Sequence, residues 1–255
     1  MDLRPYLEFA LEATWAAGRI TLGYFQRPLA EDRKPDNTPV TAADRESEGE
    51  IRRRISQRWP DHAIIGEEYG QQGDLTGLTW VIDPIDGTRS FVCGVPLYAT
   101  LLALVDGQTQ RPVVGVIHLP ALGETVYAAA GAGCFWNGRR ARVSAVSDLG
   151  QAVALITCLN QMEKPGQAEA WERLRDATYI QRTWGDAYGY ALVATGRAEI
   201  MVDPAMAVWD SAPLQVILEE AGGTLTDWQG NPTIWTGSAI GTNGLLFPDV
   251  MRLMT

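Results

Sequence analysis

The sequence is poor in the residues that build zinc sites and histidine-dependent hydrolases. Its 255 residues include two histidines, His62 and His118, and three cysteines without a CxxC pair. A zinc site or a Ser-His-Asp triad needs more residues of these types or a special placement of these two. His118 lies in the strand-like segment VVGVIHL and is more typical of a packed histidine than of a catalytic base. We therefore look for another kind of chemistry.

Long apolar runs and positively charged clusters are also missing. No uninterrupted apolar run approaches the ~18 residues of a membrane span, so no membrane association is expected. The formal net charge is −10, and the only basic cluster, residues 52–54, lies between acidic residues, which is typical of a solvated helix face. Nucleic acid is therefore not expected as a partner. The charged N-terminal residues do not resemble a signal peptide.

The three cysteines, Cys93, Cys134 and Cys158, are odd in number and far apart. This pattern predicts buried free thiols and a reducing, cytoplasmic location.

What the sequence does contain is an alternation of helical and strand patterns. Apolar residues make up 46% of the chain, enough for one large α/β unit, with an N-terminal half at about 1–147 and a C-terminal half at about 148–255. The N-terminal half predicts helices at 4–26 and from Thr41 to Trp59, then strands at AIIG, WVID, TLLALVDG, RPVVGVIHLP and ETVYAAAG. The C-terminal half predicts strands at AVALITC, TYIQRTW, EIMVD and TLTDW, with helices between them. We expect sheets sandwiched between helices.

The segment WVIDPIDGTRSF, residues 80–91, joins an apolar strand to a helix and places Asp83 and Asp86 at the junction. Two carboxylates beside a buried strand are costly unless something positive lies between them. An EF-hand fails because Ile85 and Gly94 would occupy acidic positions of its loop. A phosphatase with an aspartyl nucleophile would place its acids two residues apart rather than three. The remaining interpretation is a pair of divalent cations that activate water.

That interpretation requires more acids at strand ends or helix starts. Candidates are Glu67-Glu68 after AIIG, Asp44 in PVTAAD and Asp210 in AVWDSAP. Glu67, Asp83, Asp86 and Asp210 together carry −4, which balances two Mg²⁺, and oxygen ligands suit Mg²⁺ or Mn²⁺. The Ile85 carbonyl is a further candidate ligand. The phosphate would bind at Asp86, Gly87 and Thr88, where a glycine and helix-opening N–H groups allow close approach.

These motifs resemble the inositol monophosphatase superfamily over essentially the whole chain. Glu67-Glu68, WVIDPIDGT, WDSAP, PVTAAD and EAGG match in order and spacing. The resemblance implies a five-layered αβαβα fold of the inositol monophosphatase/fructose-1,6-bisphosphatase type and Mg²⁺-dependent phosphomonoester hydrolysis. It also implies two to three metals per site, lithium inhibition and a homodimer. Glu67, Asp83, the Ile85 carbonyl, Asp86 and Asp210 would be metal ligands. Thr88 and Glu67 would orient the attacking water, and Asp44 would support Thr88.

The leaving group is predicted from the segment RTWGDAYGY, residues 182–190. Inositol-hydrolysing members typically carry a small hydroxyl residue where this chain has Asp186, and DGTTNF where it has DGTRSF. WGDAYGY and DGTRSF resemble the histidinol-phosphate phosphatase branch, whose cationic substrate suits an extra acid. Substrate contacts are expected from Arg89, Trp184, Gly185, Asp186 and Asp203. Asp186 could alternatively cap the helix that follows Gly185.

Three other functions stay open at this point. One is an inositol-1-phosphatase or broad-specificity sugar-phosphate phosphatase. A nucleotide 3′-phosphatase fits less well, because the chain is short and lacks a basic pocket. The third is a catalytically silent protein that binds metal or a partner, although every motif acid and Thr88 are present. The polar segment Glu31–Asn37 is expected to be a mobile loop over the metals.

Overall fold

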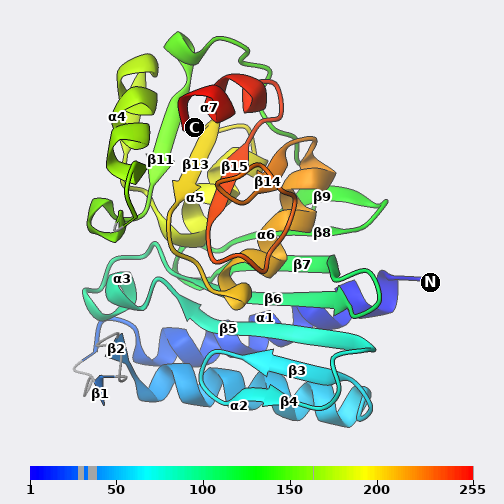
Figure 1. Ribbon diagram of the computed structural model, residues 1–255. Helices are drawn as coiled ribbons and strands as arrows, with labels where there is room; N and C mark the ends of the chain where they lie inside the picture. Colours follow the sequence, from blue (N-terminus) through cyan, green and yellow to red (C-terminus); the bar gives the residue numbers. More distant parts are fainter. Residues whose placement is uncertain (28–31, 34–38, 163, 255) are drawn as a thin grey trace.

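The structure is a computed structural model that describes residues 1–27, 32–33, 39–162 and 164–254. In this part of the chain, helices and strands are stacked in layers (Figure 1). The α-helices are α1 (Arg4–Tyr24), α2 (Ala42–Arg58), α3 (Thr88–Val92), α4 (Gln167–Ala177), α5 (Asp186–Ala194), α6 (Val208–Ala221) and α7 (Phe247–Met254). None of the helices in the described ranges has the length and apolar character needed to cross a membrane.

The N-terminal half forms an eight-stranded sheet in the order β10-β9-β8-β7-β6-β5-β3-β4. Its strands are β3 (Ala63–Gly66), β4 (Gly70–Gln72), β5 (Leu78–Asp86), β6 (Ala99–Asp106), β7 (Arg111–Leu119), β8 (Glu124–Ala129), β9 (Gly133–Trp136) and β10 (Arg139–Arg140). All neighbours are antiparallel except β3 and β5. Asn137 and Gly138 both have positive φ and form the tight β9–β10 turn expected of Asn-Gly. Strands β1 (Asp32–Arg33) and β2 (Pro39–Val40) pair separately.

The C-terminal half forms a five-stranded sheet in the order β12-β11-β13-β15-β14. Its strands are β11 (Val153–Ile156), β12 (Ile180–Arg182), β13 (Ile200–Asp203), β14 (Thr224–Thr226) and β15 (Ala239–Thr242). The central strand pairs are parallel where β11 meets β12 and β13, and β15 runs antiparallel to both of its neighbours. The parallel strands therefore end on one side, where their last residues can contribute to a common site.

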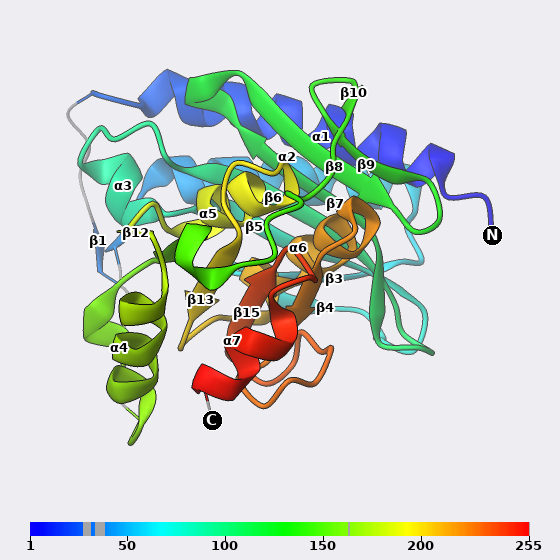
Figure 2. The same cartoon turned by 90° about the horizontal axis from the view of Figure 1, so that it is seen from above.

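The helices divide into three layers around these two sheets (Figures 1 and 2). α1 and α2 bury alanines and isoleucines against the outer face of the eight-stranded sheet. α5 and α6 lie between the sheets in a shared apolar core, and α4 and α7 pack on the far face of the five-stranded sheet. The predicted five-layered αβαβα arrangement is confirmed.

Helix α6 approaches the eight-stranded sheet closely because β7 offers a glycine at the contact. A Cβ atom on Gly115 would lie 2.4 Å from the Pro213 carbonyl oxygen. Any side chain there would push α6 outward, away from β5 and β6, which it also contacts. This close packing brings the first turn of α6, with Asp210, to the end of β5.

Two predictions about single residues can be compared with the fold directly. His118 is buried, its Nδ1 lies 2.9 Å from the Thr125 hydroxyl, and its ring stacks on Trp15, so it is a packed histidine as predicted. The prediction of three buried thiols holds only for Cys134: Cys158 is partly exposed, and Cys93 is exposed because it ends the short surface helix α3. The predicted mobile loop, Glu31–Asn37, lies outside the described residues except for positions 32 and 33.

Candidate functional site

A break in the pairing of β5 brings its two terminal aspartates together. Residues three apart on a regular strand point to opposite faces. The register of β5 with β6 shifts between Asp83 and Asp86, and this irregularity turns both side chains to the same side. One carboxylate oxygen from each, with one from Asp210 on α6, lies within 4.8 Å of the others. Three carboxylates that are distant in sequence therefore face one another.

The carboxylate cluster is strongly destabilised as a set of bare negative charges. Burial, followed by the charges of Glu67, Asp86 and Asp210, raises the pKa of Asp83 well above its usual value. Burial also raises the pKa of Asp86 well above the ordinary range, with Asp186 the largest charge contribution. The pKa of Asp210 is raised to about 7, chiefly by burial. Acids held this close need protons or cations between them.

Backbone N–H groups fix the orientation of these carboxylates. The Ile85 N–H donates to Asp83 over 3.0 Å, the Ala187 N–H to Asp86 over 2.7 Å, and the Ala207 N–H to Asp210 over 2.7 Å. The second of these bonds crosses from α5 to β5 and ties the C-terminal half to the cluster. The site is therefore pre-organised by main-chain contacts.

The hydroxyl of Thr88 is bonded differently from the prediction. It donates to the Ile85 carbonyl over 2.9 Å, and no hydrogen bond between Asp44 and Thr88 occurs among the described residues. Asp44 instead accepts the N–H and hydroxyl of Thr41, both over 2.7 Å, because it completes the capping box of α2. The predicted support of Thr88 by Asp44 is therefore corrected.

The other oxygen of Asp44, Oδ1, is buried and has no hydrogen-bond partner in the described structure. Burial raises the pKa of Asp44, and the charge of Glu67 adds to the effect. An unpaired buried acceptor indicates a missing donor or cation. The cluster's own donors are hard oxygen atoms, with the Ile85 carbonyl beside them, and such a set fits divalent cations of the Mg²⁺ type.

A cavity of about 360 Å³ opens over the cluster. Most of the residues predicted for the site line it, and they are Glu67, Asp83, Ile85, Asp86, Gly87, Thr88, Arg89, Gly185, Asp186 and Asp210. Ser90, Leu97, Thr157, Cys158, Gln161 and Thr183 line it as well and were not predicted. Thr157 follows directly after the strand AVALI, and its place at a strand end was the signal that could have identified it.

Asp186 enters this cavity from an unusual backbone conformation. Its φ is +53°, a left-handed conformation that few non-glycine residues adopt. Thr157 Oγ1 accepts its N–H over 2.8 Å, and its Oδ2 lies 3.0 Å from where a Cβ on Gly87 would be. Gly87, itself at φ +78°, therefore has to be glycine. The N-cap position of α5 belongs to Gly185, so Asp186 is not the capping residue.

The ionisation of Asp186 is tuned by its surroundings. Burial raises its pKa to about 6, and the nearby Arg89 counteracts part of that effect. Since the pKa still lies below neutral, the side chain carries a negative charge at pH 7 and above. It adds a fifth acid to a cavity that Glu67 and the three clustered aspartates also line.

Two residues predicted to contact substrate lie outside the lining of the cavity. Asp203 is buried behind Thr157: it accepts the Thr157 N–H over 3.2 Å and the Tyr190 hydroxyl over 2.9 Å, and burial raises its pKa to about 7. Trp184 is 43% exposed, with the Arg182 guanidinium 5.9 Å from its ring centroid. Asp203 therefore braces the residue that holds Asp186, while Trp184 lies on the surface.

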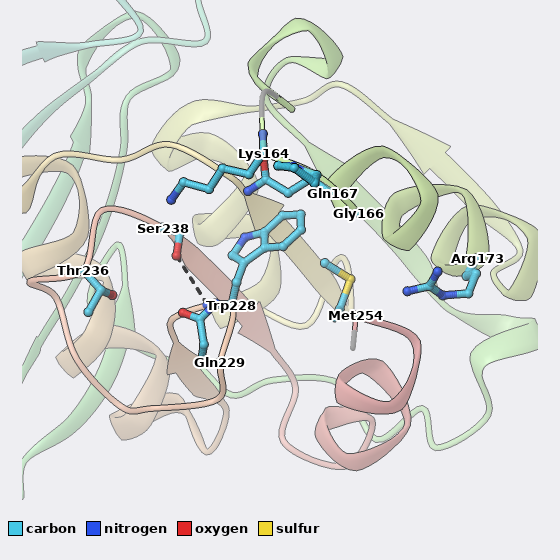
Figure 3. Close-up of a pocket in the computed structure, with 10 residues that line it drawn as sticks. Lys164, Gly166, Gln167, Arg173, Trp228, Gln229, Thr236, Ser238 and Met254 are labelled. Carbon is cyan, nitrogen blue, oxygen red and sulfur yellow. Dashed lines mark hydrogen bonds between the residues drawn. The ribbon is translucent and has the colours of Figure 1, made fainter.

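A second cavity, of about 320 Å³, lies in the C-terminal half around the Trp228 ring (Figure 3). Its described lining contains Lys164, Arg173 and Ser238 and no acidic residue. The indole N–H of Trp228 donates to the Asp203 carbonyl over 2.9 Å. One lining residue of this cavity therefore contacts Asp203, but the cavity lacks the carboxylates of the first one.

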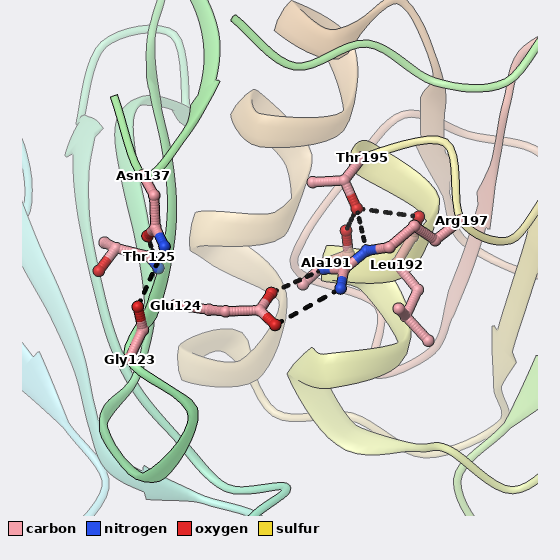
Figure 4. Close-up of polar contacts among 8 residues, drawn as sticks. All are labelled: Gly123, Glu124, Thr125, Asn137, Ala191, Leu192, Thr195 and Arg197. Carbon is pink, nitrogen blue, oxygen red and sulfur yellow. Dashed lines mark hydrogen bonds and ion pairs between the residues drawn. The ribbon is translucent and has the colours of Figure 1, made fainter. Parts of the chain in front are cut away.

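The C-terminal end of α5 is tied to the eight-stranded sheet through Arg197 (Figure 4). Its guanidinium pairs with Glu124 of β8 over 2.8 Å, donates to the Thr195 hydroxyl over 2.9 Å and lies 4.3 Å from the centroid of the Trp136 ring. Since Asp186 opens the same helix, these contacts help to hold the Asp186 side of the cavity in register with the aspartates of β5.

Comparison with known proteins agrees with this architecture. The family model described as the inositol monophosphatase family matches residues 2–251. The chain is 43% identical over 240 residues to a histidinol-phosphatase of Chlorobaculum parvum, covering 93% of this chain and 92% of that one. It is 41% identical to a histidinol-phosphatase of Mycobacterium tuberculosis over 88% and 87% of the two chains. A solved inositol monophosphatase from Zymomonas mobilis superposes with a TM-score of 0.88 at 29% sequence identity. The match covers 100% of this chain and 99% of the Zymomonas chain.

Proposed function

This chain belongs to the inositol monophosphatase family, and we propose that it hydrolyses L-histidinol phosphate to L-histidinol and inorganic phosphate with the help of divalent cations. The observation that carries the proposal is the convergence of Asp83, Asp86 and Asp210 within 4.8 Å in the cavity that also holds Asp186. The three clustered aspartates indicate metal-dependent hydrolysis, and Asp186 accounts for a preference for a cationic leaving group.

We assign the cations to Glu67, Asp83, Asp86, Asp210 and the Ile85 carbonyl, with Mg²⁺ as the ion, two to three per site. Bound there, divalent cations would polarise the phosphate ester and lower the pKa of the attacking water. We expect Mn²⁺ to substitute and Li⁺ to inhibit. The raised pKa values of the aspartates support this assignment, because carboxylates that repel one another bind cations at the cost of releasing protons.

Thr88 orients the attacking water through its lone pairs. Its hydroxyl hydrogen is committed to the Ile85 carbonyl, so the oxygen is left to accept a hydrogen bond from water. The carbonyl retains a second lone pair for a cation. Glu67, which lines the same cavity, accepts the other hydrogen of this water. Thr88 positions the water without attacking the ester itself, so no covalent intermediate is required.

The N–H groups of Gly87 and Thr88, with Asp86 beside them, form the phosphate end of the cavity. A glycine at φ +78° leaves room for the ester to approach the backbone. Asp186, across from Gly87, then faces the leaving group. Its negative charge above pH 6 pairs with the ammonium of L-histidinol phosphate.

We place this reaction in histidine biosynthesis in the cytoplasm and expect the protein to act as a homodimer. The histidinol-phosphatases among its relatives support this assignment of the pathway.

Metal-dependent phosphate release tests the reaction type. Wild-type protein should release phosphate from L-histidinol phosphate with Mg²⁺, lose that activity in EDTA and regain it when excess Mg²⁺ is added. Asp83→Asn removes a ligand from the cluster and should abolish turnover, whereas Asp61→Asn, an exposed control, should not change it. Release that is insensitive to EDTA would contradict the metal mechanism, and no release of phosphate from any monoester would favour a silent binding protein.

A further inference from the structure

A buried carboxylate outside the metal cluster holds the segment that carries Glu67. Glu48, on α2, is fully buried. Its Oε2 accepts the Glu68 N–H over 2.7 Å, and its Oε1 accepts the Tyr69 N–H over 3.2 Å. The Arg52 guanidinium, one turn further along α2, donates to Oε1 over 2.7 Å. A charge at zero exposure is stable only with this many partners.

The residue before Glu67 is shaped to receive this carboxylate. A Cβ atom on Gly66 would lie 2.1 Å from Glu48 Oε1 and 2.5 Å from its Cδ, so no residue with a side chain fits there unless the carboxylate moves. Arg52 also donates to the Gly70 carbonyl. The main chain from residue 66 to residue 70 therefore wraps around one ion pair, and Glu67 is the residue within that wrap whose side chain lines the cavity.

Glu48 lies one helical turn after Asp44 on α2, and both residues are buried. Asp44, one turn earlier on the helix, has a buried oxygen without a hydrogen-bond partner in the described structure, and the charge of Glu67 contributes to the raised pKa of its carboxyl. Glu67 in turn lies within hydrogen-bonding reach of Asp83. Glu67 is thus placed between an anchor at its backbone and the clustered aspartates at its carboxylate.

We propose that Glu48 is a positioning residue that fixes the backbone of residues 66–69, so that the Glu67 carboxylate reaches the metal site. The proposal rests on the proposed function, since it takes Glu67 to be a metal ligand. Its consequence is specific: loss of the Glu48 charge should weaken cation binding and lower kcat. The KM for the ester, to which Asp186 contributes, should change little.

The test compares Glu48→Gln with Glu50→Gln. Glutamine has nearly the same shape, but its NH₂ group turns a donor toward partners that are themselves donors. Glu50 is a matched control, because it lies on the same helix and pairs with Arg53 and Arg54 over 2.9 and 2.6 Å without touching residues 66–70. Both variants would be compared in Mn²⁺ titrations followed by electron paramagnetic resonance and by calorimetry, without substrate, and then in steady-state kinetics.

We expect Glu48→Gln to weaken the tighter Mn²⁺ site by about tenfold or more and to lower kcat with a KM within about threefold of wild type, as in other changes behind metal ligands. Glu50→Gln should match wild type in both. Gly66→Ala, which keeps the Glu48 charge but displaces its carboxylate, should weaken Mn²⁺ binding in the same way and covers the case in which Glu48→Gln does not fold.

Wild-type Mn²⁺ affinity in a folded Glu48→Gln or Gly66→Ala variant would overturn the proposal. So would equal weakening in Glu50→Gln, since that would trace the effect to the helix as a whole. Wild-type protein that binds Mn²⁺ but does not hydrolyse L-histidinol phosphate would refute the proposed function alone, and the Mn²⁺ affinities of the variants would still decide the role of Glu48.

Discussion

The charge of Asp186 is the feature that distinguishes a cationic substrate from a neutral polyol in our proposal, and Asp186→Asn isolates it. Asparagine keeps the size of the side chain and is one of the few residues that tolerate the φ of +53° found at this position. The N–H bond to Thr157 is made by the backbone and is retained. The substitution therefore removes one negative charge from the cavity and leaves the wall in place.

The size of the effect follows from the contact that is lost. A hydrogen bond to a charged group contributes about 1.5–3 kcal/mol, which corresponds to a fall in kcat/KM of about 10- to 150-fold. We expect a loss of this size for L-histidinol phosphate. For inositol-1-phosphate, which has no ammonium to pair with Asp186, the loss should stay within about threefold.

The pH dependence gives a second measure of the same charge. With a pKa of about 6, Asp186 is almost fully ionised at pH 8 and about one-tenth ionised at pH 5. Protonation of the metal cluster affects kcat/KM for both substrates alike, so its effect cancels in the ratio of the two values. We expect this ratio to fall about tenfold from pH 8 to pH 5 in wild type and to stay flat in Asp186→Asn.

The assay is phosphate release at saturating Mg²⁺ on both substrates, with Asp61→Asn as the exposed control. An equal loss on both substrates in Asp186→Asn, or a wild-type ratio that does not vary with pH, would refute the assignment of specificity to this residue. Asp186 would then be a structural part of the cavity wall.

Further predictions concern the cluster, the backbone and the connection between the halves. Without metal, Asp210 in the folded protein has a pKa of about 7, whereas in the unfolded chain it loses its proton near pH 4. Urea titrations in EDTA should therefore show the unfolding free energy falling from about pH 4 to 7. Mg²⁺ should remove much of this pH dependence. Asp83→Asn should be more stable than wild type in EDTA at pH 8, because a buried charge is removed, and a lower midpoint would contradict the assigned repulsion. Gly87→Ala, forced to φ +78° with its Cβ 3.0 Å from Asp186, should lose about 1–3 kcal/mol of unfolding free energy as well as activity. Arg197→Ala should cost about 1–2 kcal/mol in the same titration through its lost ion pair and ring contact, with Mn²⁺ affinity unchanged.

Most of the layered fold could be predicted from hydrophobic periodicity and turn residues. The helix beginning after Thr41, the apolar strand that leads into Asp83 and the Asn137-Gly138 turn all have strong local signals, although β5 continues beyond the predicted strand to Asp86. β15 and α7 were not predicted, because AIGT is a short run beside glycines and the last helix is only Phe247–Met254. Their formation depends on packing against β13 and α4, which no local pattern records.

The site shows the same division between local and long-range information. The acids of the cluster could be named from their motifs, and the structure brings Asp83, Asp86 and Asp210 together. The burial of Asp203 behind Thr157 and the surface position of Trp184 depend on tertiary contacts across the chain. Residue type alone did not separate a side chain that touches the cavity from one that braces it.

The most direct test of the proposed substrate is a comparison of kcat/KM for L-histidinol phosphate and inositol-1-phosphate, measured side by side with Mg²⁺ at several concentrations. We expect L-histidinol phosphate to be preferred by about a hundredfold or more, in line with one charge-assisted contact in a partly buried cavity. Similar or reversed values would contradict the assignment to histidinol phosphate and would favour an inositol-1-phosphatase or a broad-specificity sugar-phosphate phosphatase built on the same metal centre.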